Sequence, residues 1–98
     1  MELKSKSRRY LRTLGQEMNP TVMLGKEGLT PGLLAALDGE LARRELVKVR
    51  VQRSAGGEAN EWAESAATDA GATVVCILGR TFLLYRPNPE LKERIRLP

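Results

Sequence analysis

The sequence predicts a small α/β protein, built as two layers, in which helices alternate with the strands of one mixed four-stranded sheet. Apolar residues recur at helical spacing in three segments and at alternating spacing between them, which is typical of amphipathic helices and half-buried strands. A chain of 98 residues, 42% of them hydrophobic, suffices for one domain with one modest core. Helices that return the chain between strands imply a layer of helices on a sheet.

The first expected helix spans residues 5–18, where leucines and a methionine recur every three or four positions and basic residues occupy the rest of the turn. The segment TVML at 21–24 begins with β-branched residues and predicts a short strand. Thr30 and Pro31 then suit the N-cap and first position of a second helix, which should reach about residue 44.

The second half of the chain contains the clearest strand, at 46–51, where three valines alternate with lysine and arginine. Asn60 is expected to cap a third helix whose alanine stripe allows close approach to a sheet, and Gly71 is expected to end it. Two apolar segments then flank Gly79-Arg80, a pair with glycine first, as a type II′ hairpin turn requires. The predicted order is helix followed by β-α-β-α-β-β, with the last two helices on one sheet face.

Positive charge is concentrated at the two ends of the chain. Residues 1–12 carry five basic and one acidic residue, and residues 80–98 carry five basic and two acidic residues. Residues 13–79 hold six basic and nine acidic residues, although the net charge is +4. This distribution fits a polyanionic partner contacted by the ends, and equally fits solvated ends that keep the protein soluble. We expect residues 1–88 to form the domain and residues 89–98 a basic, mostly irregular tail.

Several classes of function are disfavoured by what the sequence lacks. There is no histidine, which excludes every mechanism that uses an imidazole base or ligand. The single cysteine, Cys76, lies in an apolar run and cannot form a disulfide within the chain. No secretory signal or membrane-length apolar stretch is recognisable. We therefore expect a cytoplasmic protein that is not an enzyme and has no metal, cofactor or small-molecule substrate.

The motif Gly25-Lys26-Glu27-Gly28 joins the first expected strand to the second helix. It is not a P-loop and lacks the three-glycine dinucleotide fingerprint. Its glycines would let a phosphate backbone approach closely, Lys26 would add a mobile positive charge, and the amides at the helix start would face an anion. The alternative is a simple turn before a capped helix.

Four motifs, in this order, extend over residues 5–88: RRYLR, LGKEGLT, ELVKV and GRTFLLYR. Together they resemble the YhbY family of bacterial RNA-binding proteins, which share the CRM (chloroplast RNA splicing and ribosome maturation) domain. The resemblance implies a fold similar to the C-terminal domain of translation initiation factor three with a helix added in front. It also implies association with precursors of the large ribosomal subunit, and hence ribosomal RNA as partner.

The resemblance assigns RNA contacts to the loop, to the basic first helix and to the final hairpin: Gly25, Lys26, Glu27, Gly28, Arg8, Arg9, Arg12, Arg80 and Arg86. Glu27 departs from the expected chemistry because an acid repels phosphate. Ser7, Tyr10 and Tyr85 remain open as further contacts or core residues.

We expect a monomer that recognises structured RNA, with Lys26, Arg80 and Arg9 or Arg12 bordering one continuous positive face. The alternative function is a protein-interaction module that docks on ribosomal proteins or assembly factors.

Overall fold

The computed structural model describes residues 1–98, and its elements follow the predicted order. The helices are α1 (Ser5–Gln16), α2 (Pro31–Arg44) and α3 (Ala59–Ala70), with a short 3₁₀ turn η1 (Arg53–Ala55), and the strands are β1 (Val22–Leu24), β2 (Leu46–Val51), β3 (Thr73–Leu78) and β4 (Thr81–Tyr85). The strands lie in the order β1-β2-β4-β3. β1 is parallel to β2 and the other neighbours are antiparallel, so the predicted mixed four-stranded sheet is confirmed.

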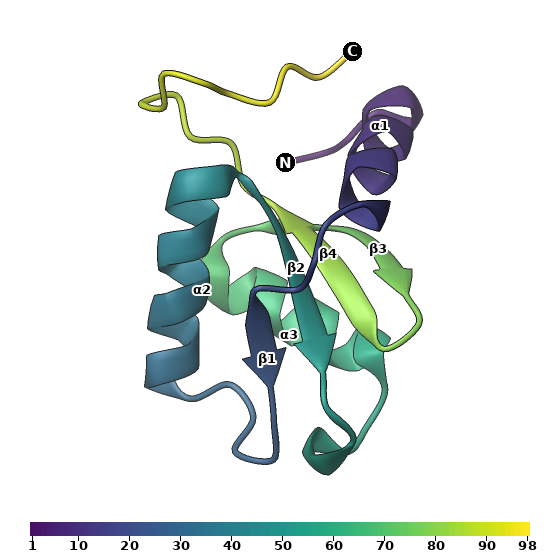
Figure 1. Cartoon of the computed structure of the whole chain (residues 1–98), viewed down its shortest axis with the longest axis vertical. Helices are drawn as coiled ribbons and strands as arrows, with labels where there is room; N and C mark the ends of the chain where they lie inside the picture. The colour runs from purple at the N-terminus through teal and green to yellow at the C-terminus, as the bar shows by residue number, and fades with distance from the viewer.

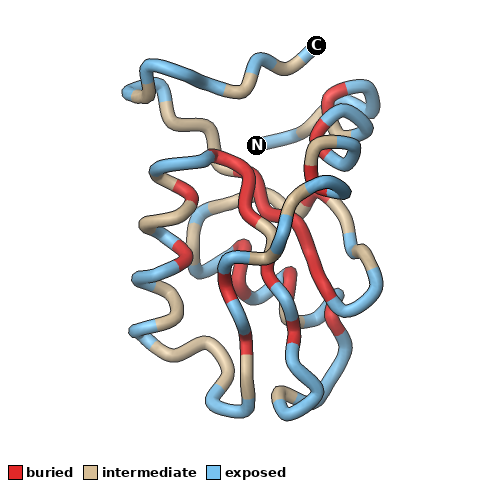
Figure 2. The backbone as a smooth tube through the Cα atoms, in the orientation of Figure 1, coloured by how far each residue is buried: buried red, intermediate tan, exposed pale blue.

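Helices α2 and α3 cover one face of this sheet, as predicted (Figure 1). The alternating valines Val47, Val49 and Val51 of β2 all point toward them and are buried. Small alanines line the inner side of α3 and let it lie close to β3 and β4. Figure 2 shows the buried residues concentrated in the strands and inner helix faces, while the loops at both ends of the sheet are exposed.

Helix α1 lies on the opposite face and contacts β2 and β3. Leu11 is buried there against a second, smaller core that includes Leu46, Val75, Leu83 and Tyr85. The helix ends at Gln16, two residues earlier than expected. A Cβ built on Gly15 would overlap the side chain of Leu83, so glycine at this position allows the end of α1 to approach the sheet.

Only part of this second face is covered by α1. The Nζ of Lys48 in β2 donates hydrogen bonds of 3.1 Å to the carbonyls of Gly15 and Met18, which ties the end of the helix to the strand. Two residues further along the same strand, Arg50 is exposed. The solvent-facing side predicted for β2 is therefore open only at the end of the strand where Arg50 lies.

The C-terminal tail forms no helix or strand, but a buried carboxylate fixes its path. Glu45, at 0% exposure, accepts hydrogen bonds from the amides of Asn88 (2.6 Å) and Ile95 (2.8 Å) and from Nε of Arg94 (3.2 Å). Burial alone raises the pKa of Glu45, but these three donors outweigh it and hold the pKa below its usual value. Figure 1 shows the tail running across the end of the molecule where the N-terminus also lies.

The ends of the helices test the predicted capping residues. Thr30 caps α2 as expected, and its hydroxyl accepts a 3.1 Å hydrogen bond from the amide of Leu33. The prediction of Asn60 as the cap of α3 is wrong, because the helix begins at Ala59, two residues earlier than such a cap would allow, and Glu58 is the N-cap. Glu58 and Glu61 form a reciprocal capping box that satisfies amides at both positions, so the pair replaces a single short polar cap.

None of the helices combines the length and apolar composition needed to cross a membrane.

Candidate nucleic-acid interface

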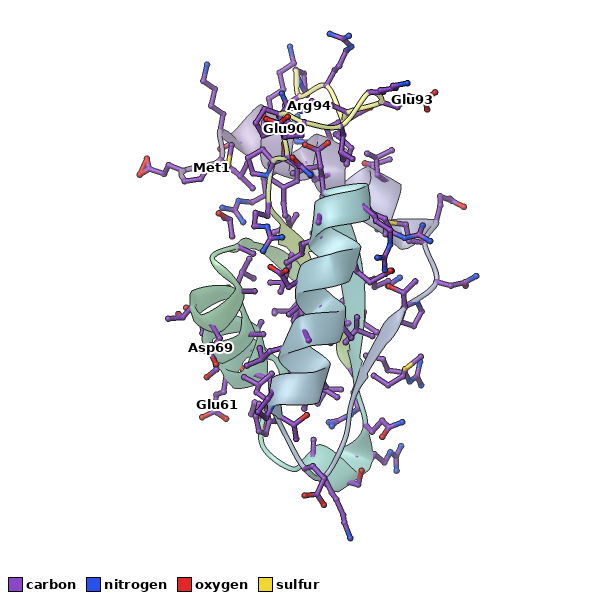
Figure 3. All side chains as sticks on the ribbon, turned by 90° about the vertical axis from the view of Figure 1, so that its left-hand side faces the viewer. Met1, Glu61, Asp69, Glu90, Glu93 and Arg94 are labelled. Carbon is purple, nitrogen blue, oxygen red and sulfur yellow. The ribbon has the colours of Figure 1, made fainter.

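The two helical faces of the sheet carry opposite charge. Helix α1 contains four basic residues and no acidic residue, whereas α3, on the other face, contains three acidic residues and no basic one. Figure 3 shows two of these, Glu61 and Asp69, on the outer side of α3. A polyanion is therefore attracted to the α1 side of the sheet and repelled from the α3 side.

The loop that joins β1 to α2 holds the GKEG motif in a tight turn. The amide of Gly28 donates a 2.9 Å hydrogen bond to the carbonyl of Gly25, and Gly28 itself adopts a φ of +71°. Lys26 and Glu27 stand at the tip and are exposed, and neither takes part in any of the ion pairs of the structure. The ammonium group of Lys26 is thus available to a ligand.

Amide groups around this loop also remain available. Thr30 occupies the amide of Leu33, but the amide of Gly32 is not among the main-chain or side-chain donors. The same holds for the amides of Lys26 and Glu27 at the tip. Unused amides next to a helix N-terminus favour an anion, so the backbone supports the charge of Lys26.

Residues that the sequence analysis did not assign to the site support the loop from beneath. Trp62 of α3 packs on Gly28 and donates a 2.8 Å hydrogen bond from Nε1 to the carbonyl of Gly56. The amide of Gln52 donates a 2.8 Å hydrogen bond to the carbonyl of Leu24, directly before the motif. Trp62 is half-buried, and its position over a glycine is visible only in three dimensions.

The three predicted arginines of α1 fall into two kinds. Arg9 and Arg12 are exposed and are not among the residues joined by ion pairs. Arg8 is half-buried, and its Nη1 donates hydrogen bonds of 2.7 and 2.6 Å to the carbonyls of Val74 and Val75. A bulge interrupts the pairing of β3 with β4 at this point, so Arg8 satisfies carbonyls that the ladder leaves free.

The two predicted arginines of the final hairpin lie at opposite ends of β4. Arg80 precedes the strand and donates to the carbonyls of Val51 (3.0 Å) and Gln52 (3.1 Å), which fixes the start of the neighbouring loop. Arg86 follows the strand and is bound to Asp38 (2.7 Å) and to the carbonyl of Ala70 (2.9 Å). Arg80 therefore lies at the GKEG end of the sheet, whereas Arg86 joins α2 to α3 at the other end.

The residues left open as further contacts are also resolved. Tyr10 is 40% exposed beside Arg9, on the outer side of α1. Tyr85 is 2% exposed and belongs to the second core. Ser7 is buried, and its hydroxyl donates a 2.9 Å hydrogen bond to the carbonyl of Pro98. Of the three, only Tyr10 is accessible to a ligand.

The loop lies at one end of the sheet, whereas α1 lies on the sheet face nearer the opposite end (Figure 1). The end of β1, the end of β2 and the start of β4 are neighbours, which brings Lys26 and Arg80 to the same end of the sheet. On β3, burial raises the pKa of Cys76, and the nearby positive charges of Arg12, Arg8 and Lys48 partly offset this rise. Arg12 and Cys76 line one shallow hollow between α1 and β3.

Comparison with known proteins identifies relatives along the whole chain. The sequence profile of the CRS1 / YhbY (CRM) domain matches residues 3–86. An RNA-binding protein of Haemophilus influenzae is 35% identical over 96 residues, which cover 98% of this chain and 95% of that protein. A Bacillus subtilis protein named "Probable RNA-binding protein YqeI" is 30% identical, with 98% and 99% of the two chains covered.

A solved structure agrees with these relationships. The solution structure of the Staphylococcus aureus protein SAV1595 superposes with a TM-score of 0.78 at 32% sequence identity, covering 99% of this chain and 100% of that one. The match of the family profile over most of the chain and the relatives of nearly equal length lead to the same conclusion: this protein belongs to the CRS1 / YhbY (CRM) domain family.

Proposed function

We propose that this protein binds structured RNA, without catalysing a reaction, through phosphate contacts made by the GKEG loop and the basic side of α1. The observation that carries the proposal is an exposed, unpaired Lys26 in a loop whose tip amides donate no hydrogen bond within the protein, followed by the unused amide of Gly32 at the start of α2. The relatives named as RNA-binding proteins support it.

The chemistry of the loop suits a phosphodiester. A GxxG loop in KH domains clamps a nucleic-acid backbone by close approach and amide contacts, and the loop from Gly25 to Gly28 offers the same features between a strand and a helix. Glu27 lies at the tip and opposes phosphate, so we assign attraction to Lys26 and to the amides. Arg9 and Arg12 add mobile charges on the exposed side of α1. Arg80 contributes by holding the loop after β2.

The proposed RNA is ribosomal RNA in precursors of the large subunit, and the protein acts on it as a monomer in the cytoplasm. This part of the proposal comes from the family resemblance carried by the RRYLR, LGKEGLT, ELVKV and GRTFLLYR motifs. Docking on ribosomal proteins or assembly factors is the competing function, in which the basic ends serve solubility.

The test is binding of the purified protein to protein-free large-subunit ribosomal RNA over a range of salt concentrations. Phosphate-dominated binding should weaken steeply with salt, with a log-log slope of about −0.7 to −0.9 per contact. A variant with Arg9, Arg12 and Lys26 all changed to alanine should lose most of this slope. Absence of binding, or a flat salt response, together with capture of the protein by ribosomal proteins would favour the docking function.

A further inference from the structure

A row of side chains crosses the sheet face between the GKEG loop and α1. The strand register places Met23 of β1 beside Arg50 of β2, and Arg50 beside Thr81 of β4. Val22 and Leu24, on either side of Met23, are buried against the helices of the other face, so Met23 points to the α1 side. This row lies beyond the part of the face that α1 covers.

Arg50 is exposed and differs from most arginines of the chain in having no partner within it. The arginines whose side chains bind other protein groups are Arg8, Arg43, Arg44, Arg80, Arg86 and Arg94. Met23 next to it is 47% exposed and is one of the few large apolar side chains at the surface. The two side chains therefore form a small open platform, one flat and cationic and the other apolar.

The position of this platform relates it to the proposed phosphate contacts. Lys26 follows Met23 by three residues, at most about 10 Å of extended chain. On the other side, Lys48 precedes Arg50 by two residues and holds the end of α1. Arg50 therefore lies between the loop and the part of the sheet face that α1 covers.

We propose that Arg50 and Met23 stack an unpaired base of RNA whose backbone is held by the Gly25–Gly28 loop. The proposal rests on the RNA-binding function proposed above and adds that the bound RNA presents a single-stranded nucleotide. Guanidinium planes stack on splayed-out bases, and the thioether of methionine contacts rings favourably. A protein partner would require a larger apolar centre than one methionine beside an arginine.

The Arg50→Lys variant distinguishes base stacking from simple charge attraction, because lysine keeps the positive charge but has no planar group. The experiment uses a short single-stranded RNA that carries one fluorescent adenine analogue, whose emission falls when it stacks. Four full-length variants are compared: Arg50→Lys, Arg50→Ala, Lys26→Ala, and Lys92→Ala as a control that removes one exposed charge from the tail. Circular dichroism and thermal melting establish that each is folded.

We expect Arg50→Lys to keep the salt slope of the wild type but to lose the fluorescence change. Its affinity for the single-stranded RNA should fall by about fivefold or more, since fivefold is the smallest loss expected when one base no longer stacks. Arg50→Ala should lose the fluorescence change and also reduce the salt slope. Lys26→Ala should weaken binding yet keep the fluorescence change, and Lys92→Ala should resemble the wild type. Fully paired RNA should respond to Lys26→Ala but not to Arg50→Lys.

Two results would overturn the inference, and they differ in what they say of the function. If Lys26→Ala weakens binding while Arg50→Lys retains both affinity and fluorescence change, RNA binding stands and the stacking platform does not exist. If the wild type binds neither single-stranded nor structured RNA, the proposed function fails and the platform fails with it.

Discussion

The indole ring of Trp62 lies against the backbone of Gly28. A Cβ built on Gly28 would stand 3.2 Å from Cη2 of Trp62, and the residue also has a φ of +71°, which L side chains rarely adopt. Glycine is thus required at position 28 for two reasons, the backbone conformation and the close contact with Trp62. The first glycine of the motif is required less strictly, because a Cβ on Gly25 would meet only the end of the flexible Gln52 side chain, at 2.8 Å.

Replacing the two glycines should therefore have unequal effects. Gly28→Ala should lower the free energy of unfolding by about 1–2 kcal/mol, the usual penalty for a left-handed L residue, and should weaken RNA binding by displacing Lys26. Gly25→Ala should cost less than about 0.5 kcal/mol because the Gln52 side chain can rotate away. Thermal melting and RNA titration of both variants test this, and equal losses of stability would contradict it.

Arg8 and Arg9 offer a second matched pair, since they are adjacent in sequence but differ in what they contact. Arg8→Ala leaves the carbonyls of Val74 and Val75 without their donor and should lower the free energy of unfolding by about 1–3 kcal/mol. Arg9→Ala should change stability by less than about 0.5 kcal/mol but should weaken RNA binding and reduce the salt slope by about one contact.

Both variants remove one positive charge from the same helix, so net charge does not separate them. Denaturant unfolding and salt-dependent titration measure the two effects independently. If Arg8→Ala were as stable as the wild type, the hydrogen bonds at the bulge would contribute nothing, and Arg8 would return to the group of available RNA contacts.

The order of elements could be predicted because its signals are local. The Thr30-Pro31 pair, the alternating valines of β2 and the glycine of the β3–β4 turn each act within a few residues. Gly79 adopts a φ of +62° and Arg80 does not adopt a positive φ, as the predicted turn requires. Glu58 was missed as a cap because glutamate is unusual there and acts only together with Glu61.

The residues of the candidate site could be predicted from the sequence. Which of their side chains are free for a ligand and which are bound within the protein could not. The GKEG motif is continuous in sequence, so its loop was recognisable. The partners of Arg8 and Arg86 lie 66 and 48 residues away, and nothing in the local pattern distinguishes a bound arginine from a free one. Arg50 was correctly placed on the solvent side of its strand, but the extent of α1 over that side depends on tertiary packing.

Glu45 predicts a pH dependence of stability that involves the tail. The pKa of Glu45 is lower in the folded protein than in the unfolded chain. Its ionised carboxylate therefore stabilises the fold fully above the ordinary glutamate pKa of about 4.3, and this stabilisation is lost as the pH falls through the pKa of the folded state. Glu45→Gln should lower the free energy of unfolding by about 1–3 kcal/mol at neutral pH, because a buried amide cannot accept all three bonds. The difference in free energy of unfolding between the wild type and Glu45→Gln should narrow below a pH of about 4.3.

Urea unfolding of both proteins at several pH values measures this difference. Arg94→Ala provides the control, since it removes one donor and leaves the two amide bonds of the tail in place. A constant difference between wild type and Glu45→Gln across the acid range would show that the charge of Glu45 does not stabilise the tail.

The tip of the GKEG loop gives the most direct test of phosphate binding, because its two charged residues are exposed and opposite in sign. Lys26→Ala should leave the melting temperature within the range of an ordinary surface substitution, about 0.5 kcal/mol, yet weaken binding to a structured ribosomal RNA fragment. Its salt slope should fall by about one contact. Glu27→Lys should strengthen RNA binding and raise the salt slope, since it removes a repulsive charge and adds an attractive one in the same turn.

The two substitutions control for each other. A general effect of net charge would be reproduced by Lys92→Ala and by Glu93→Lys, which make the same changes in charge on the exposed tail. If the loop cradles phosphate, the loop variants should change affinity several times more than the tail variants, since electrostatic attraction between exposed groups is screened beyond about 10 Å. Unchanged affinity in both loop variants at moderate salt would mean that the glycines only turn the chain and that Arg9 and Arg12 bind RNA without them.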